Sequence, residues 1–266
     1  MIQALKKIDW KLFAVLLGAG LLGVVAIIPY VMDLIGTRMI DRGASPDLPL
    51  PLVVILAIVQ NGVLLTLVIL IGLILSERVG LQVPLIRGWV GGQRTTNVRA
   101  VALPGIAVGA AVGVVLVGTE AVFFLRHLPA AMRSAFEIGL WKRLLGGVVY
   151  GGITEELFMR LFLVSLTAWL LSRRWKTREG RPTAGAFWAA IVLVAIVFGL
   201  GHLPATSLLT PLTPLIVTRG LVLNAVAGVA FGWLFWKYGL EAAMLGHMSA
   251  HVVMQVPGVM LLRAMF

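Results

Sequence analysis

The chain has 266 residues, of which 60% are hydrophobic and only 12% are charged, and its mean hydropathy is +1.01. This composition excludes an ordinary soluble domain and predicts an all-α membrane protein with several transmembrane helices. The net charge of +11 does not predict a nucleic-acid partner, because the basic residues gather between apolar runs, where membrane topology accounts for them.

Seven apolar runs are long enough to cross a bilayer as helices, which takes about 20 residues each. They are Leu12–Leu34, Leu50–Leu75, Val101–Leu125, Leu144–Leu171, Ala184–Leu203, Leu215–Trp236 and Ala242–Leu262. We therefore expect a polytopic membrane helix bundle of seven to eight transmembrane helices, which forms a single membrane domain over residues 1–266. Lys6, Lys7 and Lys11 precede the first run, but this run is too long for a signal peptide and lacks a small-residue cleavage site. We expect it to remain as the first helix.

The charges of the connecting segments predict an orientation. Ser76–Arg99 and Arg173–Arg181 are basic, whereas Thr37–Pro49 has no net charge and Pro204–Pro214 has no charged residue. The positive-inside rule then places the N-terminus in the cytoplasm, and we expect an integral protein of the cytoplasmic membrane of a prokaryote. The basic segment Arg126–Arg143 is an exception, because the same rule places it outside.

Three charged residues interrupt the fourth apolar run: Glu155, Glu156 and Arg160. A charge in the middle of a bilayer costs several kcal/mol, so such residues usually face a polar cavity and mark a functional site. Glu156 and Arg160 are four residues apart and share a helix face, where they can form an ion pair. Glu155 points about 100° away and is left free. The alternative is an ion-pair cluster with a structural role only.

Three of the four histidines also lie in apolar surroundings: His202 near the end of the fifth run, and His247 and His251 in the last. A single histidine in a membrane is more often a hydrogen-bonding residue between helices than a catalyst. His247 and His251 are four residues apart, so their rings share one helix face, and Gly246 beside them lets another helix approach closely. Glutamate can act as a general base towards water and imidazole can share that proton or polarise a carbonyl, so this set can hydrolyse an amide. With no cysteine in the chain, a cysteine nucleophile and a thiolate metal site are excluded.

Other polar residues lie in the apolar runs. Arg219 and Asn224 belong to the sixth run, where either residue is placed to line a cavity and Asn224 is expected to hydrogen-bond between helices. Glu120 lies near the end of the third run and is expected at the membrane interface.

The three motifs resemble those of a known family. "EELFMR" (Glu155–Arg160), "FGLGH" (Phe198–His202) and "HMSAH" (His247–His251) are similar, in this order, to motifs of the CAAX-protease and bacteriocin-processing family, the CPBP or Abi group of intramembrane proteases. The stretch Ala227–His247 also resembles the family segment that leads into the last motif. Each motif alone is weak evidence, but the ordered set is specific. The resemblance covers residues 144–266, which we interpret as a CPBP-like catalytic core, preceded by N-terminal helices over residues 1–143.

The resemblance implies an intramembrane endopeptidase, a hydrolase that cuts a peptide bond in a membrane-anchored or lipidated substrate. It implies that Glu155 activates the attacking water with His202, and that His247 helps to hold the oxyanion. Glu156 and Arg160 would order the site or contact the substrate. The last motif of the family most often ends in asparagine, whereas this chain has His251 there, and a histidine can donate, accept or bind a metal.

Two mechanisms remain open. In the metal-free mechanism, His247 and His251 stabilise the tetrahedral intermediate after Glu155 and His202 have activated water. In a metalloprotease, the three histidines and Glu155 would hold zinc, and a coordinated water would be the nucleophile. We favour the metal-free mechanism with no cofactor, because the resemblance implies an oxyanion role for the last motif.

Two other functions compete with the protease. A proton-coupled transporter would use Glu155 and the histidines as a relay. Such transporters often show repeat symmetry or paired broken helices, and the sequence shows neither. A non-catalytic immunity or scaffold protein of the membrane would keep the same motif residues in an idle site.

Overall fold

The structure is a computed structural model that describes residues 8–41, 49–92 and 97–265. Within these ranges the chain is helical, and it has no β-strand beyond an isolated pairing of Lys176 with Pro182. The all-α fold predicted from composition is therefore confirmed. Lys6, Lys7 and most of the loop expected at Thr37–Pro49 lie outside the described residues.

The helices follow one another along the chain with short connections. They are α2 (Trp10–Asp41), α3 (Leu50–Val79), α4 (Pro84–Val90), α5 (Val98–Thr119), η1 (Glu120–Phe124), η2 (Leu125–His127), α6 (Ala130–Arg133), η3 (Ser134–Glu137), α7 (Leu140–Leu144), η4 (Leu145–Glu155), η5 (Leu157–Val164), α8 (Ser165–Leu171), α9 (Ala184–Gly201), α10 (Leu203–Leu209), α11 (Pro214–Tyr238), α12 (Leu240–Val253), η6 (Met254–Gly258) and α13 (Val259–Arg263).

Six helices in the described residues are long and apolar enough to cross a membrane, and they correspond to six of the seven predicted runs. The remaining run is the helical segment from α7 to α8, Leu140–Leu171, which is less apolar because it carries the two glutamates and Arg160. The helix bundle expected from the sequence is thus present. One boundary differs, because α2 continues to Asp41, beyond the expected end of the first span at Leu34.

Polar residues fix where several helices begin. The side chains of Asp9, Asn97, Thr183 and Thr213 accept hydrogen bonds from backbone N–H groups in the first turns of α2, α5, α9 and α11. These N–H groups have no partner within their own helix, so a side-chain oxygen at this position stabilises the helix end. Gly239, with a φ of 96°, makes the sharp turn between α11 and α12.

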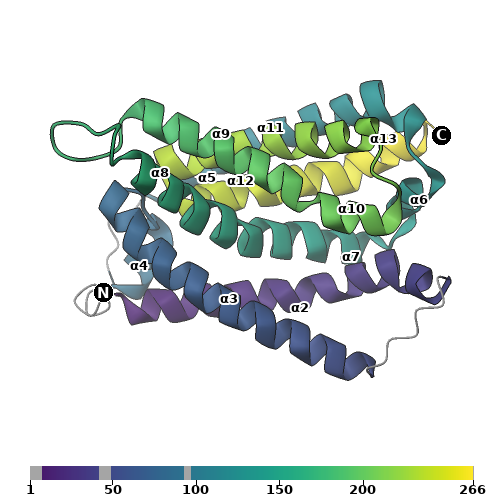
Figure 1. The fold of residues 1–266 in the computed structure, drawn as a ribbon, viewed down its shortest axis with the longest axis horizontal. Helices are drawn as coiled ribbons and strands as arrows, with labels where there is room; N and C mark the ends of the chain where they lie inside the picture. The colour runs from purple at the N-terminus through teal and green to yellow at the C-terminus, as the bar shows by residue number, and fades with distance from the viewer. Residues whose placement is uncertain (1–7, 42–48, 93–96, 266) are drawn as a thin grey trace.

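The segment α7–α8 lies in the middle of the molecule (Figure 1). The helices α2 and α3 pack on one side of it, and α9 and α12 pack on the other. Thr154 ties this segment to α2 by donating a hydrogen bond to the carbonyl oxygen of Gly20 at 2.9 Å. A single set of buried apolar residues runs from α2 to α12, so the helices before and after residue 140 share one core.

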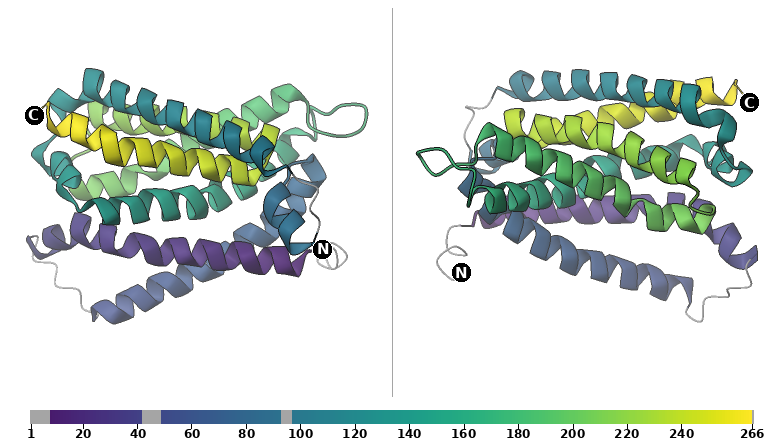
Figure 2. Two further views of the ribbon diagram at one scale, coloured as in Figure 1. Left: turned by 180° about the vertical axis from the view of Figure 1, so that it is seen from behind. Right: turned by 45° about the horizontal axis from the view of Figure 1, so that its top comes forward.

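The helix α5 lies along α12 on the back of the molecule (Figure 2, left). Its residues Gly105, Gly109 and Gly113 recur every four residues, and each faces a backbone carbonyl of α12 so closely that an added Cβ would collide with it. Small residues at this spacing let two membrane helices approach closely. The close approach expected at Gly246 is therefore present, with α5 as the helix that makes it.

The outer surface and the helix ends fit a membrane. Large apolar side chains are exposed along α3. Only 17% of the most apolar 18-residue stretch of this helix is buried inside the protein, as expected of a helix that faces lipid. Trp10, Trp89, Trp141 and Trp175 are exposed near the helix ends, as in the aromatic belts of membrane proteins. The basic loop between α8 and α9 and the helix α4 lie at the same end as the N-terminus (Figure 1).

The basic segment Arg126–Arg143, which did not fit the positive-inside rule, lies at the opposite end of the bundle. Lys142 forms an ion pair with Asp33 at 2.6 Å, and Glu137 forms one with Arg263 at 2.9 Å. The guanidinium of Arg143 is buried and donates to the carbonyl oxygens of Phe136 and Ile138. Part of the positive charge of this segment therefore has a structural role. The positive-inside rule counts such residues without regard to their partners.

Candidate active site

The helix that carries the glutamates is wound more widely than an α-helix. Residues 145–155 and 157–164 form π-helical turns, in which each N–H donates to the carbonyl five residues earlier. This stretch begins with a glycine-rich sequence, and Gly147, Gly151 and Gly152 face the side chains of His251, His247 and Met248 on α12. A Cβ at Gly147 would overlap the ring of His251. The glycines thus allow the two histidines to lie against the glutamate helix.

Glu156 is fully buried and has two partners. Its Oε2 lies 3.2 Å from Nε of Arg160, and its Oε1 accepts a hydrogen bond from Nδ1 of His247 at 2.7 Å. Glu156 and Arg160 thus form the ion pair on one helix face that their spacing of four residues predicts. The contact with His247 is a finding of the structure, and it links the first motif to the last.

Aromatic rings surround this buried ion pair. The guanidinium of Arg160 lies over the rings of Phe198 and Phe231, at 5.3 and 5.6 Å from their centroids. Phe231 also stacks on the ring of His247, with centroids 4.8 Å apart. Two aromatic faces therefore stabilise the cation while they exclude water from the side of the site behind Glu156.

Glu155 lies in a different environment, since 21% of its side chain is exposed. Its Oε1 lies 4.0 Å from Nε2 of His202, and its Oε2 lies 3.9 Å from Nε2 of His247. Both separations are too long for a direct hydrogen bond, and polar groups at such distances are often bridged by water. The structure thus brings Glu155, His202 and His247 together from three helices, in a place that is partly open.

The second nitrogen of each ring fixes its orientation. Nδ1 of His202 donates to the carbonyl oxygen of Phe198 at 2.8 Å, because a carbonyl can only accept. Nδ1 of His247 donates to the carboxylate of Glu156 in the same way. In both rings Nε2 therefore points at Glu155 and is a lone-pair acceptor when the ring is neutral, or a donor when it is doubly protonated.

His251 lies next to this set rather than beside Glu155. Its ring stacks on that of His247, with centroids 5.0 Å apart and planes at 17°. In the described part of the chain, no nitrogen of His251 comes within 4.0 Å of a carboxylate oxygen, and its buried Nδ1 has no hydrogen-bond partner. His251 is therefore placed to support His247, and its contact with the oxyanion stays a prediction.

The donor atoms allow a test of the zinc alternative. The two imidazoles and the carboxylate of Glu155 are ligand types that zinc accepts. Among the described residues, however, no group of three or more such side chains is arranged to hold a metal ion. The metal-free mechanism therefore stays a prediction, which a measurement of metal content can test.

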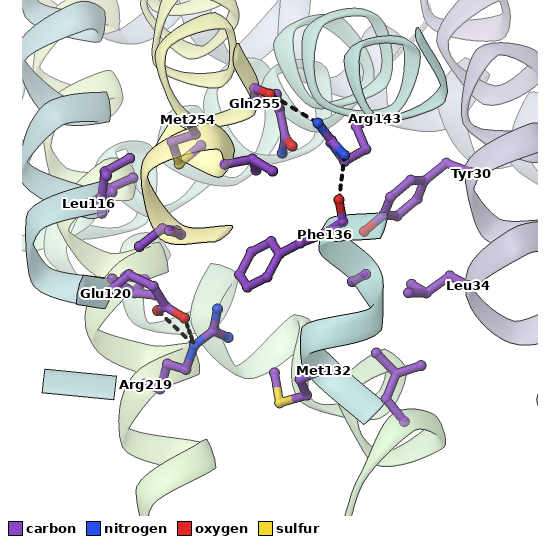
Figure 3. A pocket seen from close by; sticks show the side chains of 16 residues that line it. Tyr30, Leu34, Leu116, Glu120, Met132, Phe136, Arg143, Arg219, Met254 and Gln255 are labelled. Atoms are coloured by element: carbon purple, nitrogen blue, oxygen red, sulfur yellow. Dashed lines mark hydrogen bonds and ion pairs between the residues drawn. The ribbon is translucent and has the colours of Figure 1, made fainter. Parts of the chain in front are cut away.

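Two other polar residues of the apolar runs have clear partners. Glu120 is buried within the protein, and both of its oxygens accept from Nε of Arg219, at 3.0 and 2.8 Å. The pair lies in the wall of a cavity of about 270 Å³, which Arg143 also lines (Figure 3). Asn224 donates to the carbonyl of Gly220 in its own helix instead of bonding across helices. The partner of Glu120 lies 99 residues away, so no local pattern in the sequence could have identified it.

Fold and site together define a polytopic membrane protein in which a glutamate and two histidines meet within the helix bundle. The family model described as type II CAAX prenyl endopeptidase Rce1-like matches residues 137–253, a segment that contains all three motifs. This match, to a family of CAAX proteases, confirms the resemblance seen in the motifs for this segment of the chain. Neither a curated protein nor a solved structure gives a significant match to the chain.

Proposed function

We propose that this protein is an intramembrane endopeptidase that hydrolyses a peptide bond of a membrane-anchored or lipidated substrate with water activated by Glu155. The observation that carries the proposal is the position of Glu155, whose two oxygens face Nε2 of His202 and Nε2 of His247 at 4.0 and 3.9 Å. The match of residues 137–253 to a CAAX prenyl endopeptidase family model supports the same chemistry.

Glu155 and His202 are suited to activate the nucleophile. A water between them donates one hydrogen bond to Oε1 of Glu155 and the other to the lone pair on Nε2 of His202. Glu155 then takes a proton from this water as the water oxygen attacks the carbonyl carbon of the substrate. The electron pair of the carbonyl π bond moves to its oxygen and forms the oxyanion.

His247 is suited to stabilise that oxyanion. Since its Nδ1 donates to Glu156, its Nε2 carries a hydrogen only when the ring is a cation. The carboxylates of Glu155 and Glu156 lie beside the ring and favour its cation as the oxyanion forms, whereas burial and Arg160 oppose the cation. When the intermediate collapses, the C–N bond breaks and Glu155 returns its proton to the departing amine.

Glu156 and Arg160 are positioning residues in this proposal. Both are buried, and Glu156 reaches the reacting groups only through His247. Their role is to hold the His247 ring with Nε2 directed at the reaction site. His251 stacks on the ring of His247 and supports it through this contact.

The test is a peptidase assay in detergent micelles, with fluorogenic peptides that carry a C-terminal prenyl-cysteine motif. The variant Glu155→Gln keeps the size of the side chain but removes the base, and we expect kcat/KM to fall by about 10³-fold or more, since general-base catalysis contributes roughly 10²–10⁴. Glu137→Gln, which alters an exposed carboxylate away from the site, is the matched control.

A transporter would respond differently to the same pair of variants. If wild type and Glu155→Gln cleave equally slowly while Glu155→Gln abolishes proton uptake into proteoliposomes, the protease assignment is wrong. Unchanged cleavage by Glu155→Gln would also exclude Glu155 as the base.

A further inference from the structure

The helix α3 lies at the edge of the bundle and leaves one face uncovered (Figure 1). Its inner face packs on α2, where Gly62 meets the side chain of Leu21, and on η5, where Gly72 meets Leu161. Six exposed residues recur on its outer face at alternating intervals of four and three, and we call them the α3 stripe: Val53, Ala57, Gln60, Leu64, Leu67 and Ile71. An apolar row with this mean period of 3.5 residues is the pattern by which one helix packs along another.

Gln60 is a polar residue in this otherwise apolar stripe. It is exposed, and its side-chain amide has no hydrogen-bond partner among the described residues. Ile58 and Gly62 of the inner face are each two positions away, or about 200° around the helix, so Gln60 points away from the bundle. An amide that faces hydrocarbon without a hydrogen-bond partner is costly.

The depth of Gln60 places its amide among lipid chains. Leu65 packs against Gly20 and Gly62 packs against Leu21, so α3 runs antiparallel to α2. Gln60 is therefore level with the middle of the apolar run of α2. Water does not reach a lipid-facing side chain at this depth, and lipid tails offer it no hydrogen bond. The missing partner of the amide must come from another helix.

A second copy of this chain fits that requirement. Copies of a membrane protein share one orientation, so a twofold axis along the membrane normal brings two α3 helices together in parallel, with both Gln60 side chains at the same depth. A side-chain amide carries donors and an acceptor, so two of them satisfy each other. Ala57, one turn before Gln60, is small and lets the two helices approach. A single polar residue in an apolar row also fixes the register of such a pair.

We propose that the protein forms a parallel homodimer through the α3 stripe, in which the two Gln60 side chains donate hydrogen bonds to each other. From Val53 to Ile71 the stripe rises about 27 Å, close to the roughly 30 Å of the hydrocarbon core, so the contact extends through the membrane. The stripe points away from the bundle, and each protomer keeps its own Glu155 and histidines.

Cysteine cross-linking of the full-length protein in membranes tests the proposal, because the native chain contains no cysteine. In Ala57→Cys the two thiols meet across the dimer, at the Cα separation of about 4.4–6.8 Å that a disulfide needs. We expect mild oxidation to convert most of this variant to a covalent dimer. Ile55→Cys is the matched control, because Ile55 is 55% exposed but lies on the opposite side of the same helix. It should give at least fivefold less dimer.

A second variant tests the amide pair itself. Because Gln60 is exposed, Gln60→Leu should fold and melt no lower than wild type. We expect its dimer dissociation constant to rise about fivefold or more, since two interhelical hydrogen bonds are lost. Energy transfer between copies labelled at Lys176→Cys in lipid vesicles measures this constant. Val59→Leu, which alters an exposed apolar residue outside the stripe, should leave it unchanged.

Three results would overturn the proposal: equal cross-linking at positions 57 and 55, absence of a wild-type dimer in vesicles, or an unchanged dissociation constant in Gln60→Leu. If Ala57→Cys instead forms a disulfide with a cysteine-bearing membrane peptide and no dimer, the stripe binds substrate and the homodimer is wrong. Because the readout is association, a protein that cuts nothing can still pass this test.

Discussion

Adjacent glutamates in one helix have different surroundings, and this difference defines their roles. Glu156 is enclosed by Arg160, His247 and aromatic rings, whereas Glu155 is partly open and meets two imidazole nitrogens across water-sized gaps. A buried, paired carboxylate is held in one place and is unsuited to collect protons from water. The open glutamate is the one with access to the nucleophile.

Removal of Arg160 should destabilise the protein. The side chain is 1% exposed, and its loss leaves the charge of Glu156 in a low-dielectric setting. Breaking a buried ion pair typically costs about 3–5 kcal/mol, so we expect Arg160→Ala to lower the free energy of unfolding by roughly that amount. Thermal unfolding in detergent measures it, with Arg173→Ala as the exposed control. If Arg160→Ala melts like wild type, the pair does not support the fold.

The replacement of His251 by asparagine separates the two mechanisms. His251 stacks on His247 and has no contact with Glu155, so we expect His251→Asn to keep activity within about tenfold of wild type, because it loses packing rather than a base. We also expect purified wild type to contain less than stoichiometric zinc by mass spectrometry. One equivalent of zinc, lost together with activity in His251→Asn, would make this a metalloprotease.

Contacts within one helix could be predicted from the sequence, and contacts between distant helices could not. The pairing of Glu156 with Arg160 follows from their spacing, and the three motifs indicated that Glu155, His202 and His247 meet. The bond between Glu156 and His247 spans 91 residues and depends on the rotation of both helices, which sequence periodicity does not specify. The same holds for Glu120 with Arg219 and for the cavity that they line.

Among the elements, α12 packs closely on α5 through small residues. Gly105, Gly109 and Gly113 of α5 let the backbone of α5 meet the carbonyl oxygens of Ala242, Gly246 and Ala250 of α12. The helix α12 also carries His247, which faces Gly151 of the glutamate helix. Close packing on α5 therefore sets how far His247 reaches towards the glutamates.

A valine at position 109 should disrupt this packing. A Cβ there would collide with the carbonyl group of Gly246, which is backbone and cannot rotate away. We expect Gly109→Val to lower the free energy of unfolding by about 3 kcal/mol, at the upper end of overpacking costs, and to reduce activity with it. Gly118→Val is the control on the same helix, since nothing lies within 4 Å of its added Cβ. Equal melting temperatures for the two variants would show that α5 does not pack on α12 in this way.

For the whole molecule, the two ends of the bundle differ in charge. The end with the N-terminus holds α4 and the basic loop 172–183, and the other end holds the uncharged loop 210–213 and the segment 125–139. Next to this segment, Lys142 pairs with Asp33 and Arg143 donates to the backbone carbonyls of Phe136 and Ile138. Because these cations have structural partners, the basic segment Arg126–Arg143 is weaker evidence against a cytoplasmic N-terminus.

Single cysteines test this orientation directly, because the native chain contains none. Lys176 and Ser207 are exposed at opposite ends of the bundle. If the basic loop faces the cytoplasm, a membrane-impermeant maleimide should label Ser207→Cys in intact spheroplasts and should label Lys176→Cys only after the membrane is permeabilised. The reverse pattern would place the N-terminus outside and the cavity between Arg143 and Arg219 at the cytoplasmic end. In that case the paired cations of residues 126–143, and not the loop 172–183, would determine the topology.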